Sequence, residues 1–119
     1  MEKHVLIVED DTAILEMIEY LLSASGLKVR GVTTVQHFWQ TMQAYIPDVI
    51  ILDIMLPDGN GADLCTQLKL SDDTKHIPIV LMSANLNRRE LESRNCAQDY
   101  ISKPFDVNNF VALVHRQVA

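Results

Sequence analysis

The apolar residues of this chain alternate between two patterns, and this alternation restricts the fold more than any other feature. Short, wholly apolar runs are typical of strands that are buried on both faces. Such runs occur at Val5–Val8, Val49–Leu52 and Ile79–Met82, and two weaker ones at Lys28–Val32 and Tyr100–Ile101.

The segments between these runs have the spacing of amphipathic helices. In the first segment, Ile14, Ile18, Leu21 and Leu22 share a face, and Gly26 follows as a stop signal. The others are expected at Phe38–Tyr45, Ala62–Leu70, Asn87–Asn95 and Val107–Val118, the fourth helix being short and very polar. A strand–helix unit repeated in this way predicts an α/β fold, a parallel sheet with helices on both faces. All strands then end at one edge of the sheet, where ligands bind in this architecture.

Composition excludes several classes of protein. A net charge of −6 argues against a surface for nucleic acid or for an anionic membrane. The N-terminus lacks the pattern of a signal peptide, and no apolar stretch approaches the roughly 20 residues that span a bilayer. Cys65 and Cys96 form no CxxC motif and are expected to be inert small hydrophobes in a reducing compartment. We therefore expect one compact domain over residues 1–119, located in the cytoplasm.

Residues capable of chemistry follow four of the five predicted strands. Glu9 and Asp10 follow the first strand, Asp53 the third and Ser83 the fourth, and Lys103 comes shortly after the fifth. Carboxylates brought together at one edge raise one another's pKa or require a cation. A hard divalent ion with oxygen ligands meets that requirement, and Mg²⁺ is the expected one.

A phosphoryl group is the substrate that this set of residues fits best. Lys103 supplies a mobile positive charge for a phosphoryl oxygen, and Ser83 supplies a hydroxyl donor. No cysteine or histidine lies at these strand ends, which leaves a carboxylate as the nucleophile. Asp53 follows the central strand and is the best-placed acceptor.

Four motifs occur in order along the chain, and each of them alone is a weak signal. They are Val8–Asp11, Leu52–Gly59, Ser83–Ala84 and Asp99–Phe105. Together, over essentially its whole length, the sequence resembles the receiver domain of two-component response regulators, of the CheY-like superfamily. The resemblance implies a flavodoxin-like, doubly wound (βα)₅ fold with strand order 2-1-3-4-5.

The resemblance also implies roles for the acidic residues. Asp53 would accept a phosphoryl group from a sensor histidine kinase or a histidine phosphotransfer protein. Asp10 would bind Mg²⁺ directly, Glu9 would bind it through water, and Asp53 and the backbone carbonyl of Met55 would complete the protein ligands. The domain would catalyse only its own phosphorylation and dephosphorylation and would not itself bind nucleic acid.

A switch is implied as well. Ser83 and Lys103 would hold the phosphoryl oxygens, and the Lys103–Pro104 peptide bond would be cis. Ser83 would move toward the phosphoryl group, and the ring of Tyr100 would then turn inward. This would change the face formed by the fourth helix, fifth strand and fifth helix, where an effector domain or a second subunit would bind.

The sequence departs from the family between Ser83 and Lys103. Ser83 replaces the commoner threonine, the segment is slightly short, and Cys96-Ala97 replaces the usual Gly-Ala. We therefore expect a shortened or displaced fourth helix. Met55 and Asn85 occupy the positions that tune access of the hydrolytic water in the family, and Met55 is expected to lengthen the life of the acyl phosphate.

Two other functions remain open from the sequence. One is a Mg²⁺-dependent aspartyl phosphohydrolase, which Met55 disfavours because such enzymes usually carry an acid at that position. The other is a degenerate receiver or flavin binder that acts as a binding module. Asp11 is expected to cap a helix rather than bind metal, and residues 58–61 are expected to form a turn.

Overall fold

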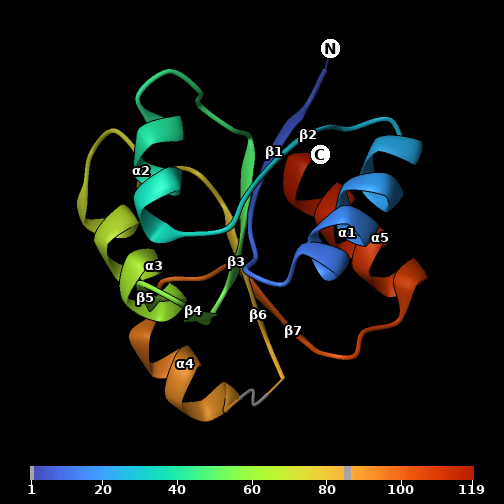
Figure 1. Ribbon diagram of the computed structural model, residues 1–119. Helices are drawn as coiled ribbons and strands as arrows, with labels where there is room; N and C mark the ends of the chain where they lie inside the picture. Colours follow the sequence, from blue (N-terminus) through green and yellow to red (C-terminus); the bar gives the residue numbers. More distant parts are fainter. Residues whose placement is uncertain (1, 85–86) are drawn as a thin grey trace.

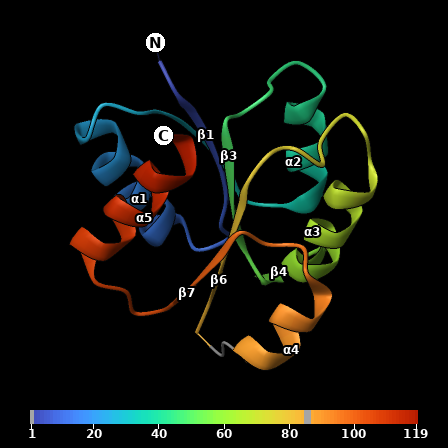
Figure 2. The ribbon, with the colours of Figure 1, turned by 180° about the vertical axis from the view of Figure 1, so that it is seen from behind.

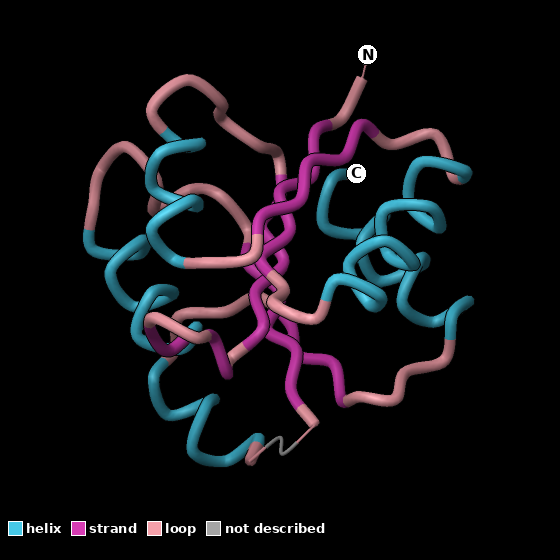
Figure 3. Tube along the Cα trace, in the orientation of Figure 1, coloured by secondary structure: helices cyan, strands magenta, loops and turns pink. Residues whose placement is uncertain are grey.

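The computed structural model describes residues 2–84 and 87–119, except for the side chain of Arg88. Its centre is a five-stranded parallel sheet with the order β2-β1-β3-β6-β7 (Figures 1 and 3). The strands are β1 (His4–Val8), β2 (Lys28–Val32), β3 (Val49–Asp53), β6 (Ile79–Ser83) and β7 (Asp99–Ser102). Counted along this sheet, the order is the predicted 2-1-3-4-5, so the flavodoxin-like fold is confirmed.

Helices cover both faces of the sheet. Helices α1 (Thr12–Ala24) and α5 (Val107–Val118) lie on one face, and α2 (Val35–Met42), α3 (Gly61–Leu70) and α4 (Arg88–Arg94) lie on the other (Figures 1 and 2). A small hairpin of β4 (Met55–Leu56) and β5 (Gly59–Asn60) follows β3. Within the described part of the chain, none of the helices has the length and apolar character needed to cross a membrane.

The core forms two layers because successive side chains of a strand point to opposite faces of the sheet. In β1, Val5 and Ile7 pack with α1 and α5, whereas Leu6 and Val8 pack with the helices of the other face. Every residue of β3 and β6 is buried, as predicted for the central strands.

Helix α1 buries a face slightly different from the predicted one. Leu15, Ile18 and Leu22 are buried, while Ile14 and Leu21 lie half-buried at its margins. Asp11 is the N-cap of α1 and accepts hydrogen bonds from the backbone N–H groups of residues 13 and 14, at 3.0 and 3.2 Å. The expected capping role of Asp11 is therefore confirmed.

Two helices end earlier than the longest helices that the sequence pattern allows. Helix α2 ends at Met42, and Tyr45 lies beyond it: the Tyr45 hydroxyl is 3.3 Å from Nδ1 of His4, and the Arg30 guanidinium is 4.7 Å from the Tyr45 ring centroid. Helix α4 has only seven residues and ends at Arg94, because the next residue, Asn95, has a left-handed backbone (φ 52°) that cannot continue the helix. The short fourth helix is thus confirmed.

Candidate functional site

The predicted site residues meet at the carboxyl edge of the sheet. Glu9 and Asp10 follow β1, Asp53 ends β3, Ser83 ends β6, and Lys103 directly follows β7. Strand pairing in parallel register brings these ends together: Val8 pairs with residue 52 and residue 82 pairs with Asp53.

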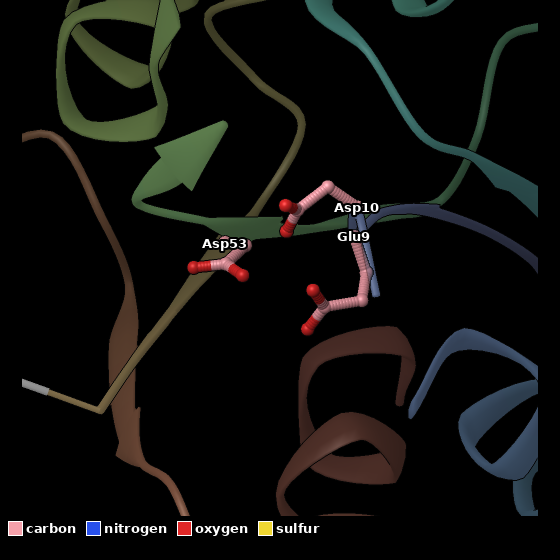
Figure 4. A group of neighbouring side chains, drawn as sticks. All are labelled: Glu9, Asp10 and Asp53. Carbon is pink, nitrogen blue, oxygen red and sulfur yellow. The ribbon is translucent and has the colours of Figure 1, made fainter. Parts of the chain in front are cut away.

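Three carboxylates form the centre of the site. Glu9, Asp10 and Asp53 each offer an oxygen, and these three oxygens lie within 4.8 Å of one another. Figure 4 shows the three side chains converging from the ends of β1 and β3. Glu9 is fully buried and Asp53 is 5% exposed, whereas Asp10 is open to solvent.

The backbone fixes two of these carboxylates. Oδ1 of Asp53 accepts a hydrogen bond from the Met55 N–H at 3.1 Å, and Oε2 of Glu9 accepts one from the Asp11 N–H at 3.1 Å. The Glu9 N–H donates to the Val32 carbonyl at 3.0 Å. Each carboxylate is therefore oriented by its own loop before any ligand binds.

Lys103 supplies the positive charge. Its ammonium donates to Oδ2 of Asp53 at 2.9 Å and also to Oε1 of Glu9. Burial lowers the pKa of Lys103, but the hydrogen bonds to Glu9 and Asp53 outweigh burial and raise the pKa above its ordinary value. The Lys103–Pro104 peptide bond is cis, and the Lys103 N–H donates to the Ser83 carbonyl at 3.0 Å.

The electrostatics of Glu9 show how crowded with negative charge the site is. Burial raises the pKa of Glu9 to about 7; the hydrogen bond from Lys103 opposes this rise, and the neighbouring Asp53 adds to it. One ammonium does not fully compensate the carboxylates. Their hard oxygen donors are those that Mg²⁺ prefers, so the residues present fit this ion.

Ser83 and Tyr100 differ in their position relative to the cluster of carboxylates and Lys103. Ser83 is 2% exposed and lies one position beyond the residue that pairs with Asp53. Tyr100 belongs to the core layer on the side of α2–α4, and its hydroxyl donates to the Leu91 carbonyl at 3.2 Å. Its ring therefore points inward.

The Met55 side chain is 73% exposed, and Asn85 lies outside the described residues.

Gly61 has a role in the site that its expected place in a turn does not indicate. A Cβ on Gly61 would lie 2.1 Å from the backbone oxygen of Asp53, so no other residue fits without moving the loop. The Gly61 N–H also donates to the Ile54 carbonyl at 2.8 Å. The start of α3 is thus packed directly on the backbone of the candidate acceptor.

Asp58 is a second residue whose contacts the sequence does not reveal. Its carboxylate accepts hydrogen bonds from the N–H groups of Val35 and Gln36, at 2.8 and 3.0 Å, and so ties the turn between β4 and β5 to the start of α2. These hydrogen bonds hold the pKa of Asp58 below its ordinary value. The partners are 22 and 23 positions away, and no local pattern signals such a contact.

Comparison with known proteins gives the same answer as the fold and the site. Residues 5–115 match the family described as "Response regulator receiver domain". The chain belongs to this family, the receiver domains of two-component response regulators, and is therefore a signalling domain.

The curated relatives include a transcriptional regulatory protein and a DNA-binding response regulator. The chain is 34% identical over 119 residues to the phosphate regulon transcriptional regulatory protein PhoB of Escherichia coli K12, covering 96% of this chain and 51% of PhoB. It is 30% identical over 120 residues to the DNA-binding response regulator MtrA of Mycobacterium leprae, covering 99% and 52%. The chain thus spans about half the length of the curated relatives it matches.

Solved structures of similar fold include receivers from other contexts. The receiver domain of a signal transduction histidine kinase from Syntrophus aciditrophicus is 28% identical with a TM-score of 0.87, covering 98% of this chain and 89% of that one. The BeF₃-activated DrrB receiver domain is 25% identical with a TM-score of 0.85, covering 99% and 98%. Receiver domains of this shape therefore include one that belongs to a histidine kinase.

Proposed function

We propose that residues 1–119 form one cytoplasmic receiver domain in which Asp53 accepts a phosphoryl group from a sensor histidine kinase or a histidine phosphotransfer protein. The observation that carries this proposal is the position of the Asp53 carboxylate. It is buried at the end of the central strand, between an acidic pair and the Lys103 ammonium. Membership of the receiver family supports it.

Mg²⁺ is the proposed cofactor. Asp10 and Asp53 would bind it directly, Glu9 through water, and the Met55 carbonyl would be a further ligand. The converging carboxylate oxygens support this set of ligands. The bound ion would neutralise charge on the transferring phosphoryl oxygens.

The remaining steps of phosphoryl transfer would be carried out by side chains of this protein. An Asp53 carboxylate oxygen forms the O–P bond while the N–P bond of a phosphohistidine breaks, and the departing imidazole keeps the electron pair. Lys103, which already contacts Oδ2 of Asp53, would then neutralise a phosphoryl oxygen. The Ser83 hydroxyl would donate to another.

The output would be a change on the face of α4, β7 and α5. Movement of Ser83 toward the phosphoryl group would favour the inward ring of Tyr100, whose hydroxyl already contacts α4 through Leu91. An effector domain or a second subunit would bind this face. The relatives named as DNA-binding or transcriptional regulators make a DNA-binding effector one candidate partner.

The experiment is labelling with acetyl phosphate and Mg²⁺, followed by intact mass spectrometry. Wild type should gain one phosphoryl group, and Asp53→Asn should gain none. Asp72→Asn is the matched control, because that carboxylate is 92% exposed and pairs with Lys75 at the surface. Labelling of Asp53→Asn would refute the proposal. An unlabelled wild type would favour a degenerate receiver, and steady turnover of a simple phosphate ester would favour the phosphohydrolase.

A further inference from the structure

The loop that follows Asp53 is a small hairpin whose tip is tied to α2. Strands β4 and β5 pair so that residues 57 and 58 form the turn between them. At this turn, the Asp58 carboxylate accepts hydrogen bonds from the backbone N–H groups of Val35 and Gln36, at 2.8 and 3.0 Å. Each carboxylate oxygen takes one N–H group, so two charge-assisted hydrogen bonds fix the turn against the start of α2.

Helix α2 does not depend on Asp58 for its cap. Thr34 is the N-cap of α2, and its side-chain oxygen accepts a hydrogen bond from the His37 N–H at 3.0 Å. The two hydrogen bonds to Asp58 are exposed, and water can replace an acceptor at a helix start. The hairpin depends more on the contact, because its strands have two residues each and such a hairpin is marginally stable alone.

Close packing holds the hairpin at both of its ends. Near the tip, a Cβ on Gly59 would lie 2.9 Å from Cγ2 of Val35, so β5 lies directly against the first residue of α2. At the base, a Cβ on Gly61 would lie 2.1 Å from the backbone oxygen of Asp53. The hairpin is therefore fixed to the candidate acceptor at its base and to α2 at its tip.

Met55 lies between these two points of attachment. Its N–H donates to Oδ1 of Asp53 at 3.1 Å, and its carbonyl is the proposed backbone ligand of Mg²⁺. The segment that leads into α2 also contacts the acidic pair, because the Glu9 N–H donates to the Val32 carbonyl at 3.0 Å. The tie between the hairpin and α2 therefore sets how the Met55 backbone lies relative to the carboxylates.

We propose that Asp58 is a positioning residue for the metal site: by tying the hairpin to α2, it fixes the loop that presents the Met55 carbonyl to Mg²⁺. Asp58 does not bind the ion, and its carboxylate is not one of the three that converge at the strand ends. It acts through the backbone, as outer supports of metal ligands do. The effect on Mg²⁺ rests on the proposed function, whereas the fixing of the loop does not.

The first test is the Kd for Mg²⁺, measured by isothermal titration calorimetry at pH 8 on variants whose folding circular dichroism has verified. Asp58→Ala should bind about tenfold more weakly than wild type, and Asp58→Asn, which keeps one acceptor oxygen, should lie between the two. An unchanged Kd for Asp58→Ala would overturn the proposal.

Thr34→Ala is the matched control for a general loss of stability in α2. It removes the helix's own cap and should lower the Tm, but it leaves Asp58 bound to the hairpin's partners. Its Kd for Mg²⁺ should stay within about twofold of wild type, because the loop at Met55 keeps its support. Equal weakening of Mg²⁺ binding by Thr34→Ala and Asp58→Ala would assign the effect to α2 as a whole and overturn the proposal.

High salt separates position from charge. Asp58→Ala also removes a negative charge, whose attraction for Mg²⁺ is screened in potassium chloride at about 1 M, where the Debye length is about 3 Å. A loss of affinity caused by a misplaced loop should persist at that salt concentration. A difference between Asp58→Ala and wild type that vanishes there would show that charge alone is responsible, which would contradict the positioning role.

The second test needs no metal. Hydrogen exchange of the Met55 N–H in the metal-free protein reports how often this loop opens. Exchange should be at least about threefold faster in Asp58→Ala than in wild type, and Thr34→Ala should keep the wild-type rate. An unchanged rate in Asp58→Ala would overturn the proposal. If wild type binds no Mg²⁺, the proposed cofactor is wrong, and exchange at Met55 still decides whether Asp58 fixes the loop.

Discussion

The ammonium of Lys103 lies 2.9 Å from Oδ2 of Asp53, although 50 positions separate the two residues in the sequence. The same ammonium contacts Glu9, 94 positions away. Among the described residues, these contacts join the ends of β1, β3 and β7 through one side chain. A single, partly buried cation thus offsets part of the negative charge of two carboxylates that have little access to water.

Replacing Lys103 by methionine tests this compensation. The change keeps the length of the side chain but leaves Glu9 and Asp53 without their cation, so we expect metal-free Lys103→Met to lose about 3 kcal/mol of unfolding free energy at pH 8. Denaturant titration by circular dichroism measures the loss. At pH 5.5 the loss should be smaller, because Glu9 is then protonated.

Lys75→Met is the matched control. Lys75 is 60% exposed and pairs with a surface aspartate, so its replacement should cost no more than about 0.5 kcal/mol. Equal stability of Lys103→Met and wild type at pH 8 would contradict the proposed compensation.

Binding of Mg²⁺ should depend on pH through Glu9. The pKa of Glu9 is about 7 in the metal-free protein. Below pH 7, Glu9 must therefore lose a proton before its carboxylate can favour binding of a cation. The Kd for Mg²⁺ should therefore fall about tenfold per unit as the pH rises toward 7, and then level off. Isothermal titration calorimetry measures this, and Glu9→Gln should bind more weakly without that slope. A flat profile for wild type would show that Glu9 does not control the site.

Most of the fold can be predicted from local patterns of apolar and polar residues in the sequence. Runs such as Val49–Leu52 are apolar at every position because β3 is buried on both faces, and Asn95 follows a polar run where α4 ends. The convergence of Glu9, Asp53 and Lys103 also follows, since parallel strands end at one edge. These features depend on short-range periodicity and on a general rule of topology.

Contacts between distant segments could not be predicted in this way. The hydrogen bonds of Asp58 to the start of α2 and the close approach of Gly61 to Asp53 both join residues whose own neighbours give no signal. The contacts of Tyr45 with His4 and Arg30, beyond the end of α2, are likewise long-range and carry no local signal.

Asp58→Ala tests one of these distant contacts. The carboxylate holds two N–H groups at the start of α2, so its loss should lower the Tm at pH 7. The pKa of Asp58 is below its ordinary value, so its contribution is present above the unfolded pKa and is lost as the pH falls through the folded pKa. Wild type and Asp58→Ala should therefore converge in acid. Asp72→Ala, which removes a 92% exposed carboxylate, should have the Tm of wild type at pH 7 and in acid. A loss of Tm in Asp58→Ala that does not change with pH would contradict the electrostatic explanation.

The switch predicts a change at Tyr100 on phosphorylation. Fluorotyrosine labelling gives three ¹⁹F resonances, from Tyr20, Tyr45 and Tyr100, and Tyr100→Phe assigns the third. Beryllofluoride with Mg²⁺ should shift the Tyr100 resonance, because the surroundings of this ring, which already points inward, change; Tyr20, which is 73% exposed, should be unchanged. Ser83→Ala should reduce this shift. An unchanged Tyr100 resonance in wild type would show that its ring does not report on the acceptor.

The central claim is that the carboxylate of Asp53 becomes an acyl phosphate, and borohydride trapping tests it most directly. The protein is treated with acetyl phosphate and Mg²⁺, reduced with borohydride, which converts an aspartyl phosphate to homoserine, and mapped by peptide mass spectrometry. We predict homoserine at position 53, with Asp10, Asp11 and Asp58 unchanged. Homoserine at another aspartate, or phosphate on a serine or histidine with Asp53 intact, would contradict the account.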